Sequence, residues 1–366
     1  MKIVFKILKW FTVILALAVL SLIGVLKYTT ACGESASIPN SVQSMQAIVY
    51  HCYGSPDVLA LETIEKPVPK EHEILVKVKA AGVNPLDWHF MRGKPYIARV
   101  MMGIGSPNTS RMGVDFSGTV EAVGEKVSNF KVGDEVFGGA NGAYSEYLII
   151  KESKAVVKKP ANVSFEQAAA VPIAAITALQ ALRDKGMIKA GQKVLINGAS
   201  GGVGTFAVQI AKSYGAEVSG VCSTRNIGLV TSLGADHIFD YKKEDFIESG
   251  QKYDLILDNV GNRSMFEYLK VLEPNGILVS IASAKGDWYG PFQHFITAAL
   301  ISPFVDNKML FFVAEMNGQD LSILANLMGE GKVKTVIDRR FKLDEVPDAI
   351  RYSETGRARG KIIIEM

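Results

Sequence analysis

The sequence predicts an α/β protein in which an all-β domain precedes a doubly wound parallel sheet, with a transmembrane helix at the N-terminus. Three observations predict this arrangement. An apolar run lies near the N-terminus, short strands separated by glycine-containing turns follow it, and strands then alternate with helices. The chain has 366 residues, 48% of them hydrophobic and 21% charged, which is enough for two globular domains.

The first 30 residues differ in composition from the rest of the chain. Three lysines precede an uncharged run from Trp10 to Leu26, which is near the short limit for a membrane span. We therefore predict that residues 1–30 form a single-pass membrane anchor; a cleaved signal and a lipoprotein leader ending at Cys32 remain alternatives. We leave the side of the membrane open, although the three N-terminal lysines favour an N-terminus in the cytoplasm and the main body on the far side. Residues 31–45 are small and polar and are predicted to be a linker.

Three further segments follow the linker. Residues 46–160 contain short strands and frequent glycines; Glu73–Ala80, for example, alternates apolar and polar side chains as a half-buried strand does. Residues 161–310 alternate strands and helices, which predicts a parallel sheet covered by helices. Residues 311–366 add further strand and helix patterns, and we expect them to return to the first domain.

A glycine-rich loop is the most informative motif. The apolar strand Lys193–Asn197 runs into Gly198–Gly204 (GASGGVG), and a helix follows directly. Glycines allow a sharp turn and let a pyrophosphate approach the backbone, and the helix N-terminus offers free N–H groups to the phosphates. This strand–loop–helix context predicts a dinucleotide-binding site.

The end of the next strand indicates which dinucleotide is bound. Enzymes that use NAD commonly place an acid there for the ribose 2′-hydroxyl, but no acid lies between Val218 and Ala235. Ser223 can donate a hydrogen bond and Arg225 can pair with a 2′-phosphate. The sequence therefore predicts NADPH rather than NADH.

Charge and cysteine content exclude other classes. Forty Lys and Arg residues against 37 Asp and Glu give a net charge of +3, so nothing indicates a nucleic-acid partner. The three cysteines, Cys32, Cys52 and Cys222, are too few for a disulfide framework or a cysteine-rich zinc lobe, and we expect all three to be separate thiols.

Several motifs together resemble one family. Residues Gly191–Lys212 match the signature G-Q-x-x-L-x-x-x-A-S-G-G-x-G-x-x-x-x-Q-x-x-K, and A-G-V-N-P-L-D and G-V-D-F-S-G occur upstream. Over residues 46–366 the chain resembles the zinc-free branch of the medium-chain dehydrogenase/reductase superfamily, the quinone oxidoreductase/zeta-crystallin group, and its tail resembles the chloroplast-envelope members. The resemblance implies a GroES-like catalytic domain over 46–160 and 311–366, and a Rossmann NADPH-binding domain over 161–310.

The resemblance also argues against a metal. Zinc-dependent relatives have a cysteine near the position of Asn84 and a Gly-His-Glu at Gly113–Asp115, and this chain has neither. The five histidines are scattered without ligand spacing. We therefore expect no metal and no alcohol oxidation through a zinc alkoxide.

The resemblance assigns roles to individual residues. Asn84 and Tyr96 are the candidate catalytic side chains, through hydrogen bonds near the nicotinamide or the substrate, whereas Asp87 is expected to support the loop. The residues expected to bind the cofactor come from the glycine loop and from loops after the strands that follow it: Thr177, Ser200, Gly201, Gly202, Val203, Ser223, Arg225, Tyr241, Asn259, Val260, Ala282 and Ser283.

The function expected from these features is hydride transfer from NADPH, without a metal, to an α,β-unsaturated carbonyl or a quinone. The sequence does not separate these two acceptors. The alternative is a membrane-tethered NADPH-binding scaffold or sensor with little turnover. A homodimer is expected only from the family.

Overall fold

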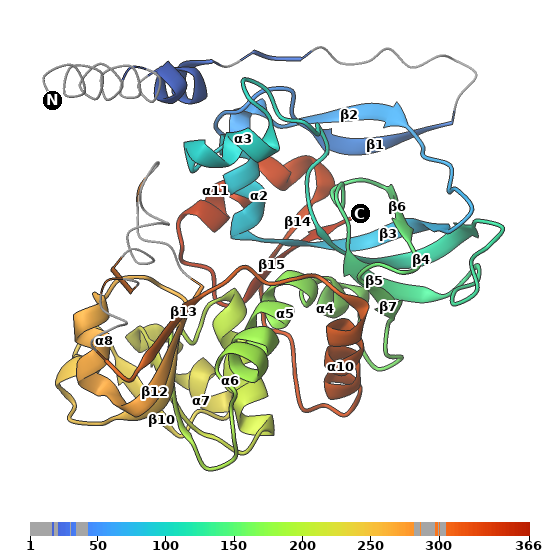
Figure 1. The fold of residues 1–366 in the computed structure, drawn as a ribbon. Helices are drawn as coiled ribbons and strands as arrows, with labels where there is room; N and C mark the ends of the chain where they lie inside the picture. Colours follow the sequence, from blue (N-terminus) through green and yellow to red (C-terminus); the bar gives the residue numbers. More distant parts are fainter. Residues whose placement is uncertain are drawn as a thin grey trace, which may run out of the picture.

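The computed structural model describes residues 17, 21–29, 31–33, 43–281, 286, 297–298, 300 and 305–366. Within these residues the chain forms two sheet-based units (Figure 1), and the glycine-rich loop contacts the first unit, since the Gly360 N–H donates to the Ser200 carbonyl at 3.0 Å. The first and last parts of the chain build one unit together, because β15 near the C-terminus pairs antiparallel with β3.

The first unit contains a seven-stranded sheet and a two-stranded ribbon. The sheet order is β14-β15-β3-β4-β5-β7, and β6 also pairs with β3. The alternating pattern seen in the sequence buries Ile74, Val76 and Val78 on one face of β3, whereas Lys77 is exposed. The strands of this unit are β1 (Ser44–Val49), β2 (Ala60–Glu65), β3 (Glu73–Val83), β4 (Asp115–Val123), β5 (Glu135–Gly139), β6 (Tyr147–Lys151), β7 (Val156–Lys158), β14 (Ile337–Lys342) and β15 (Lys361–Glu365).

The second unit is a six-stranded parallel sheet with the order β10-β9-β8-β11-β12-β13. This is the strand order of a dinucleotide-binding Rossmann domain, and its direction reverses between β8 and β11, where such domains bind ligands. The strands are β8 (Lys193–Asn197), β9 (Glu217–Cys222), β10 (His237–Asp240), β11 (Tyr253–Asp258), β12 (Leu272–Ser280) and β13 (Lys308–Phe311).

Helices cover this sheet and connect the two units. The sheet residues Val194 and Ile196 and the helix residue Phe206 are fully buried in one shared core. The helices are α2 (Pro85–Arg92), α3 (Arg99–Met102), α4 (Phe165–Ala169), α5 (Pro172–Gln180), α6 (Gly202–Ser213), α7 (Ile227–Ser232), α8 (Met265–Val271), α10 (Gly318–Gly329) and α11 (Val346–Glu354).

The predicted membrane anchor is not supported. Most of residues 1–20 lie outside the described residues, and residues 21–28 are helical. Among the residues that the structure describes, no helix is long and apolar enough to cross a membrane. The prediction of a single-pass membrane protein is therefore wrong for the described part of the chain. Leu26, which we expected inside the apolar span, is 1% exposed, and its carbonyl accepts a hydrogen bond from Arg99 of the first unit.

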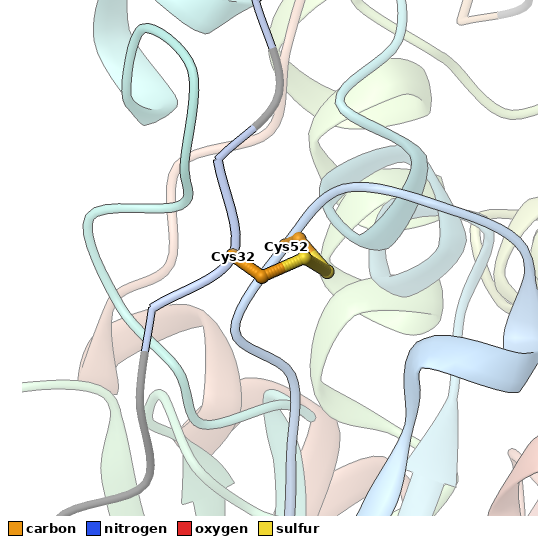
Figure 2. Close-up of a disulfide and its surroundings, with 2 residues drawn as sticks. All are labelled: Cys32 and Cys52. Atoms are coloured by element: carbon orange, nitrogen blue, oxygen red, sulfur yellow. A yellow bond between two sulfur atoms is a disulfide. The ribbon is translucent and has the colours of Figure 1, made fainter.

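The expectation of three separate thiols is also wrong. Cys32 and Cys52 form a disulfide with a Cα–Cα distance of 4.4 Å (Figure 2). Cys222 is a free, buried thiol, as expected. A spacing of 20 residues between two cysteines does not reveal a bond; the pair forms because the segment before β1 folds back onto the turn after β1.

Candidate functional site

The glycine-rich loop has the geometry of a phosphate cradle. Gly198 has φ +82°, a conformation that favours glycine, and Gly201 is the N-cap of α6 without a side-chain hydrogen bond. A Cβ at Gly201 would meet only the Gly198 carbonyl oxygen, at 3.5 Å, so this side of the loop is open. The first N–H groups of α6 follow directly and have no acceptor within the helix. Gly202 and Val203 begin the helix.

A second loop lies beside the first. Asn226 Nδ2 donates to Ser200 Oγ at 2.8 Å, which connects the glycine loop with the turn after β9. Ser223 is buried there, and Arg225 donates through Nη2 to the Arg357 carbonyl at 2.8 Å. The structure thus brings Ser200, Ser223 and Arg225 to one edge of the sheet.

An acid does lie near this turn, but it comes from the following strand. Asp240 pairs in register with Cys222, and its carboxylate accepts from Thr224 Oγ1 at 2.6 Å and from the Lys242 N–H at 3.1 Å. Because Asp240 is buried and already bonded, it is not presented as a ribose ligand in the way that an acid at the end of β9 would be.

The remaining predicted cofactor residues divide into three groups. Asn259 and Val260 lie against the glycine loop, since a Cβ at Gly198 would come within 2.8 Å of Val260 Cγ2. Thr177 lies on α5, where its hydroxyl donates to the Ile173 carbonyl, and Tyr241 is largely exposed after β10. Ala282 and Ser283 lie outside the described residues.

A buried polar cluster joins the two units next to the loop. Lys361 Nζ donates to Asn84 Oδ1 at 2.5 Å and lies 3.5 Å from Asp115 Oδ2, and Asn84 Nδ2 donates to the same Asp115 oxygen at 3.0 Å. All three side chains are at most 2% exposed. Asp115 also accepts from the Ile173 N–H, so it holds the start of α5, which carries Thr177.

Burial disfavours the charged forms of Lys361 and Asp115, and the attraction between them favours those forms. Burial lowers the pKa of Lys361 and raises the pKa of Asp115, and the attraction between the two charges opposes both shifts. Both polar atoms of the Asn84 amide are engaged within the cluster. Asn84 is therefore buried, and its amide hydrogen-bonds with Lys361 and Asp115.

Asp87 supports this cluster from behind. Its Oδ2 accepts from the Asn84 N–H and from the Tyr144 hydroxyl, both at 2.7 Å. Burial raises the pKa of Asp87 to about 7, and these two hydrogen bonds oppose the shift. The position of Asp87 is that of a supporting residue.

Tyr96 lies on a separate segment. It begins a short helical turn, Tyr96–Ala98, that leads into α3, and the Arg99 guanidinium carbon lies 5.0 Å from its ring centroid. No hydrogen bond connects Tyr96 to Asn84 among those found in the described residues. The two predicted catalytic residues are thus held by different parts of the first unit.

Sequence reasoning missed Lys361, Asp115 and Asn226 as site residues. Lys361 is the first residue of β15, and the three isoleucines after it are buried. The sequence signal is a lysine directly before three apolar residues of a strand, because a lysine buried with them needs a partner for its charge. The sequence contains no indication that this partner is Asp115, 246 positions away.

Metal and cofactor can be tested against these residues. No group of three His, Cys, Asp or Glu side chains within the described ranges could hold a metal ion. A dinucleotide fits the site: the loop is open at Gly201, the start of α6 is uncapped, and Asn226 Oδ1 and Asn259 Oδ1 are buried without a hydrogen-bond partner. Such atoms are satisfied when a ligand donates to them.

Comparisons with known proteins agree with this geometry. Residues 70–161 match the family described as "Alcohol dehydrogenase GroES-like domain", and residues 233–364 match the one described as "Zinc-binding dehydrogenase". The 2-methylene-furan-3-one reductase of Solanum lycopersicum is 37% identical over 90% of this chain and 80% of its own length. This chain is a medium-chain dehydrogenase/reductase of the zinc-free quinone oxidoreductase group.

Two further members of this superfamily support the assignment. The chloroplastic NADPH-dependent alkenal/one oxidoreductase of Arabidopsis thaliana is 35% identical over 90% of this chain and 81% of its own length. The structure of the quinone oxidoreductase from Coxiella burnetii superposes with a TM-score of 0.77, at 31% identity, over 88% of this chain and 100% of that chain. The resemblance inferred from the motifs is confirmed, and this medium-chain reductase is an NADPH-dependent oxidoreductase.

The residue expected to select NADPH is Arg225. We expect Arg225→Asp to reverse the preference, lowering kcat/KM for NADPH by about 10-fold or more, because a carboxylate repels a 2′-phosphate and accepts from a ribose hydroxyl. The measurement is the ratio of kcat/KM for NADPH and NADH. Lys189→Asp makes the same charge change at an exposed position before β8, at the opposite edge of the sheet, and serves as the control. An unchanged ratio in Arg225→Asp would show that this side chain does not bind the 2′-phosphate of NADPH.

Proposed function

We propose that this protein is a metal-free reductase of α,β-unsaturated carbonyls or quinones. The observation that carries the proposal is the Lys361 ammonium between Asn84 and Asp115. By resemblance, Asn84 lies at or near the position of a cysteine in the zinc-dependent relatives, and Asp115 ends the segment that is Gly-His-Glu there. Here the buried Lys361 ammonium contacts both side chains, so Asn84 and Asp115 already have a cationic partner within the protein.

Without a metal as Lewis acid, the acceptor must be electrophilic by itself. Bound NADPH supplies the hydride. An enone accepts it at the β-carbon and takes a proton at the α-carbon, and a quinone accepts a hydride and a proton to become a hydroquinone. The relatives named as an alkenal/one oxidoreductase and a quinone oxidoreductase support both acceptor classes.

The side chains divide the remaining work. The glycine loop with Ser200, Gly201, Gly202 and Val203 binds the pyrophosphate; Thr177, Ser223, Arg225, Tyr241, Asn259 and Val260, together with Ala282 and Ser283, bind the rest of the dinucleotide. Tyr96 donates a hydrogen bond to the oxygen on which negative charge develops. Asn84 acts as a positioning residue for Lys361.

The test is NADPH oxidation by the full chain with enones, enals and quinones assayed in parallel, with and without a chelator such as EDTA. We expect NADPH-selective turnover of at least one acceptor class, with the rate unchanged after exhaustive chelation. Loss of activity on chelation, restored by Zn²⁺, would contradict the metal-free mechanism. Saturable NADPH binding without oxidation by any acceptor would instead support the scaffold or sensor.

A further inference from the structure

Residues 21–29 and 31–33, the N-terminal stretch, contact the segment that carries Tyr96. Leu26 is the buried residue of this stretch, and its carbonyl accepts from Arg99 Nη1 at 2.8 Å. Five residues later, the Ala31 N–H donates to the Gly105 carbonyl at 3.0 Å. The N-terminal stretch therefore contacts both α3 and the loop that follows it.

The Cys32–Cys52 disulfide fastens this stretch at its C-terminal end (Figure 2). The bond joins the residue after Ala31 to the turn after β1, and the Gly33 N–H donates to the His51 carbonyl beside it at 3.0 Å. Together with the contacts to Arg99 and Gly105, these interactions hold the N-terminal stretch against residues 93–105.

The other end of the disulfide contacts the same segment. Tyr53 follows Cys52 directly; its hydroxyl donates to the Gly103 carbonyl at 2.9 Å, and its ring centroid lies 4.4 Å from the Arg99 guanidinium carbon. Both chain segments that the disulfide joins thus contact α3 or the residue that follows it.

Arg99 connects all of these parts. It is 3% exposed, although it is an arginine, and it donates to the carbonyls of Gly93 and Leu26. Its guanidinium carbon lies 4.4 Å from the ring centroid of Tyr53 and 5.0 Å from that of Tyr96. If the N-terminal stretch moved away, a buried guanidinium N–H would lose its Leu26 acceptor. An unpaired buried donor is costly, so Arg99 and the Tyr96 segment would then have to rearrange.

We propose that the Cys32–Cys52 disulfide is a redox-responsive clamp that orders the Tyr96 segment and thereby the acceptor side of the site. Reduction by a dithiol of the thioredoxin or dithiothreitol class breaks the S–S bond. Cys32 and Cys52 each gain one electron and one proton, and the dithiol becomes a cyclic disulfide with the loss of two electrons and two protons. The reduced clamp leaves the NADPH loop, which lies in the other unit, unchanged.

The first experiment does not depend on turnover. The full chain is digested with trypsin before and after reduction with dithiothreitol, and cleavage after Arg99 is followed by mass spectrometry. Because cleavage tracks the population of the open segment, we expect reduction to accelerate it about 10-fold, with cleavage after the exposed Lys243 as the internal reference. Equal rates after Arg99 in both states would overturn the clamp.

The second experiment rests on the proposed function. In the reduced protein and in Cys32→Ser/Cys52→Ser, we expect the acceptor KM to rise about 10-fold while the Kd of NADPH changes less than about twofold. Reoxidation should restore the KM of the wild type, and dithiothreitol should have no effect on the double variant. An acceptor KM that does not respond to reduction, in a protein that does turn over, would overturn the clamp.

Two controls separate the possible failures. Cys222→Ala removes the remaining thiol and keeps the disulfide, so its proteolysis and KM should respond to dithiothreitol as the wild type does. Alkylation after denaturation counts the thiols: one adduct is expected in the oxidised chain and three after reduction, and three without reduction would overturn the proposal. If no acceptor is turned over but Arg99 cleavage responds, the proposed function fails and the clamp stands.

Discussion

Gly204→Ala will abolish measurable NADPH binding and lower the free energy of unfolding by about 3 kcal/mol or more. A Cβ at this position would lie 2.1 Å from the Gly198 carbonyl oxygen and 2.8 Å from backbone atoms of Ala199. Backbone atoms cannot rotate away as a side chain can, so α6 and the glycine loop must separate. The measurements are urea denaturation and titration of NADPH by fluorescence.

Two other glycines serve as matched controls. Gly228→Ala on α7 places a Cβ where no atom lies within 4 Å, and it should leave stability unchanged or raise it by about 0.5–1 kcal/mol. Gly201→Ala has room in the free protein but fills the open side of the loop, so we expect normal stability with NADPH affinity lowered about 10-fold or more. If Gly204→Ala binds NADPH as the wild type does, the claim that NADPH binding needs this close approach of helix and loop is wrong.

Lys361→Met will destabilise the protein by about 3–5 kcal/mol, because it leaves the Asp115 carboxylate buried without its cation. Asp115 is 0% exposed and Lys361 is 2% exposed, so water cannot take the place of the lost partner. The Gly360 N–H donates to the Ser200 carbonyl at 3.0 Å, and movement at Lys361 should therefore also weaken NADPH binding.

The double variant Lys361→Met/Asp115→Asn distinguishes the loss of the ion pair from the loss of lysine side-chain packing. With both charges removed, we expect it to recover most of the about 3–5 kcal/mol lost in Lys361→Met, as measured by urea denaturation. Lys193→Met is the control, because Lys193 is also the first residue of a buried strand but is exposed, and its effect should stay within about 0.5 kcal/mol. A double variant less stable than Lys361→Met would refute the pairing.

Local sequence patterns predicted the glycine loop closely. The strand Lys193–Asn197 was predicted with its observed bounds, and the following helix begins at Gly202, within the predicted loop. Both depend on interactions between residues close together in the chain: the periodicity of apolar side chains, and glycines that permit φ angles such as the +82° of Gly198.

Contacts between distant residues were not predictable in this way. Nothing near Asn84 in sequence indicates that its amide is engaged by Lys361, 277 positions later, because the two meet only when β15 pairs with β3. For the same reason the sequence suggested a hydrogen bond from Asn84 to the nicotinamide or the substrate, whereas in the structure its amide bonds with Lys361 and Asp115.

The N-terminal region shows most clearly what local sequence patterns cannot predict. An apolar run has the same sequence pattern whether it faces lipid or protein, and Leu26, the last residue of this run, is 1% exposed with its carbonyl bonded to Arg99. Whether two cysteines pair depends on the distance between their Cα atoms, which the folded chain sets at 4.4 Å for Cys32 and Cys52. The sequence by itself determined the family, the two sheet-based units and the dinucleotide loop, since these follow from local spacing. Only the tertiary structure decided the Lys361 cluster and the disulfide, because both form between segments that meet through folding.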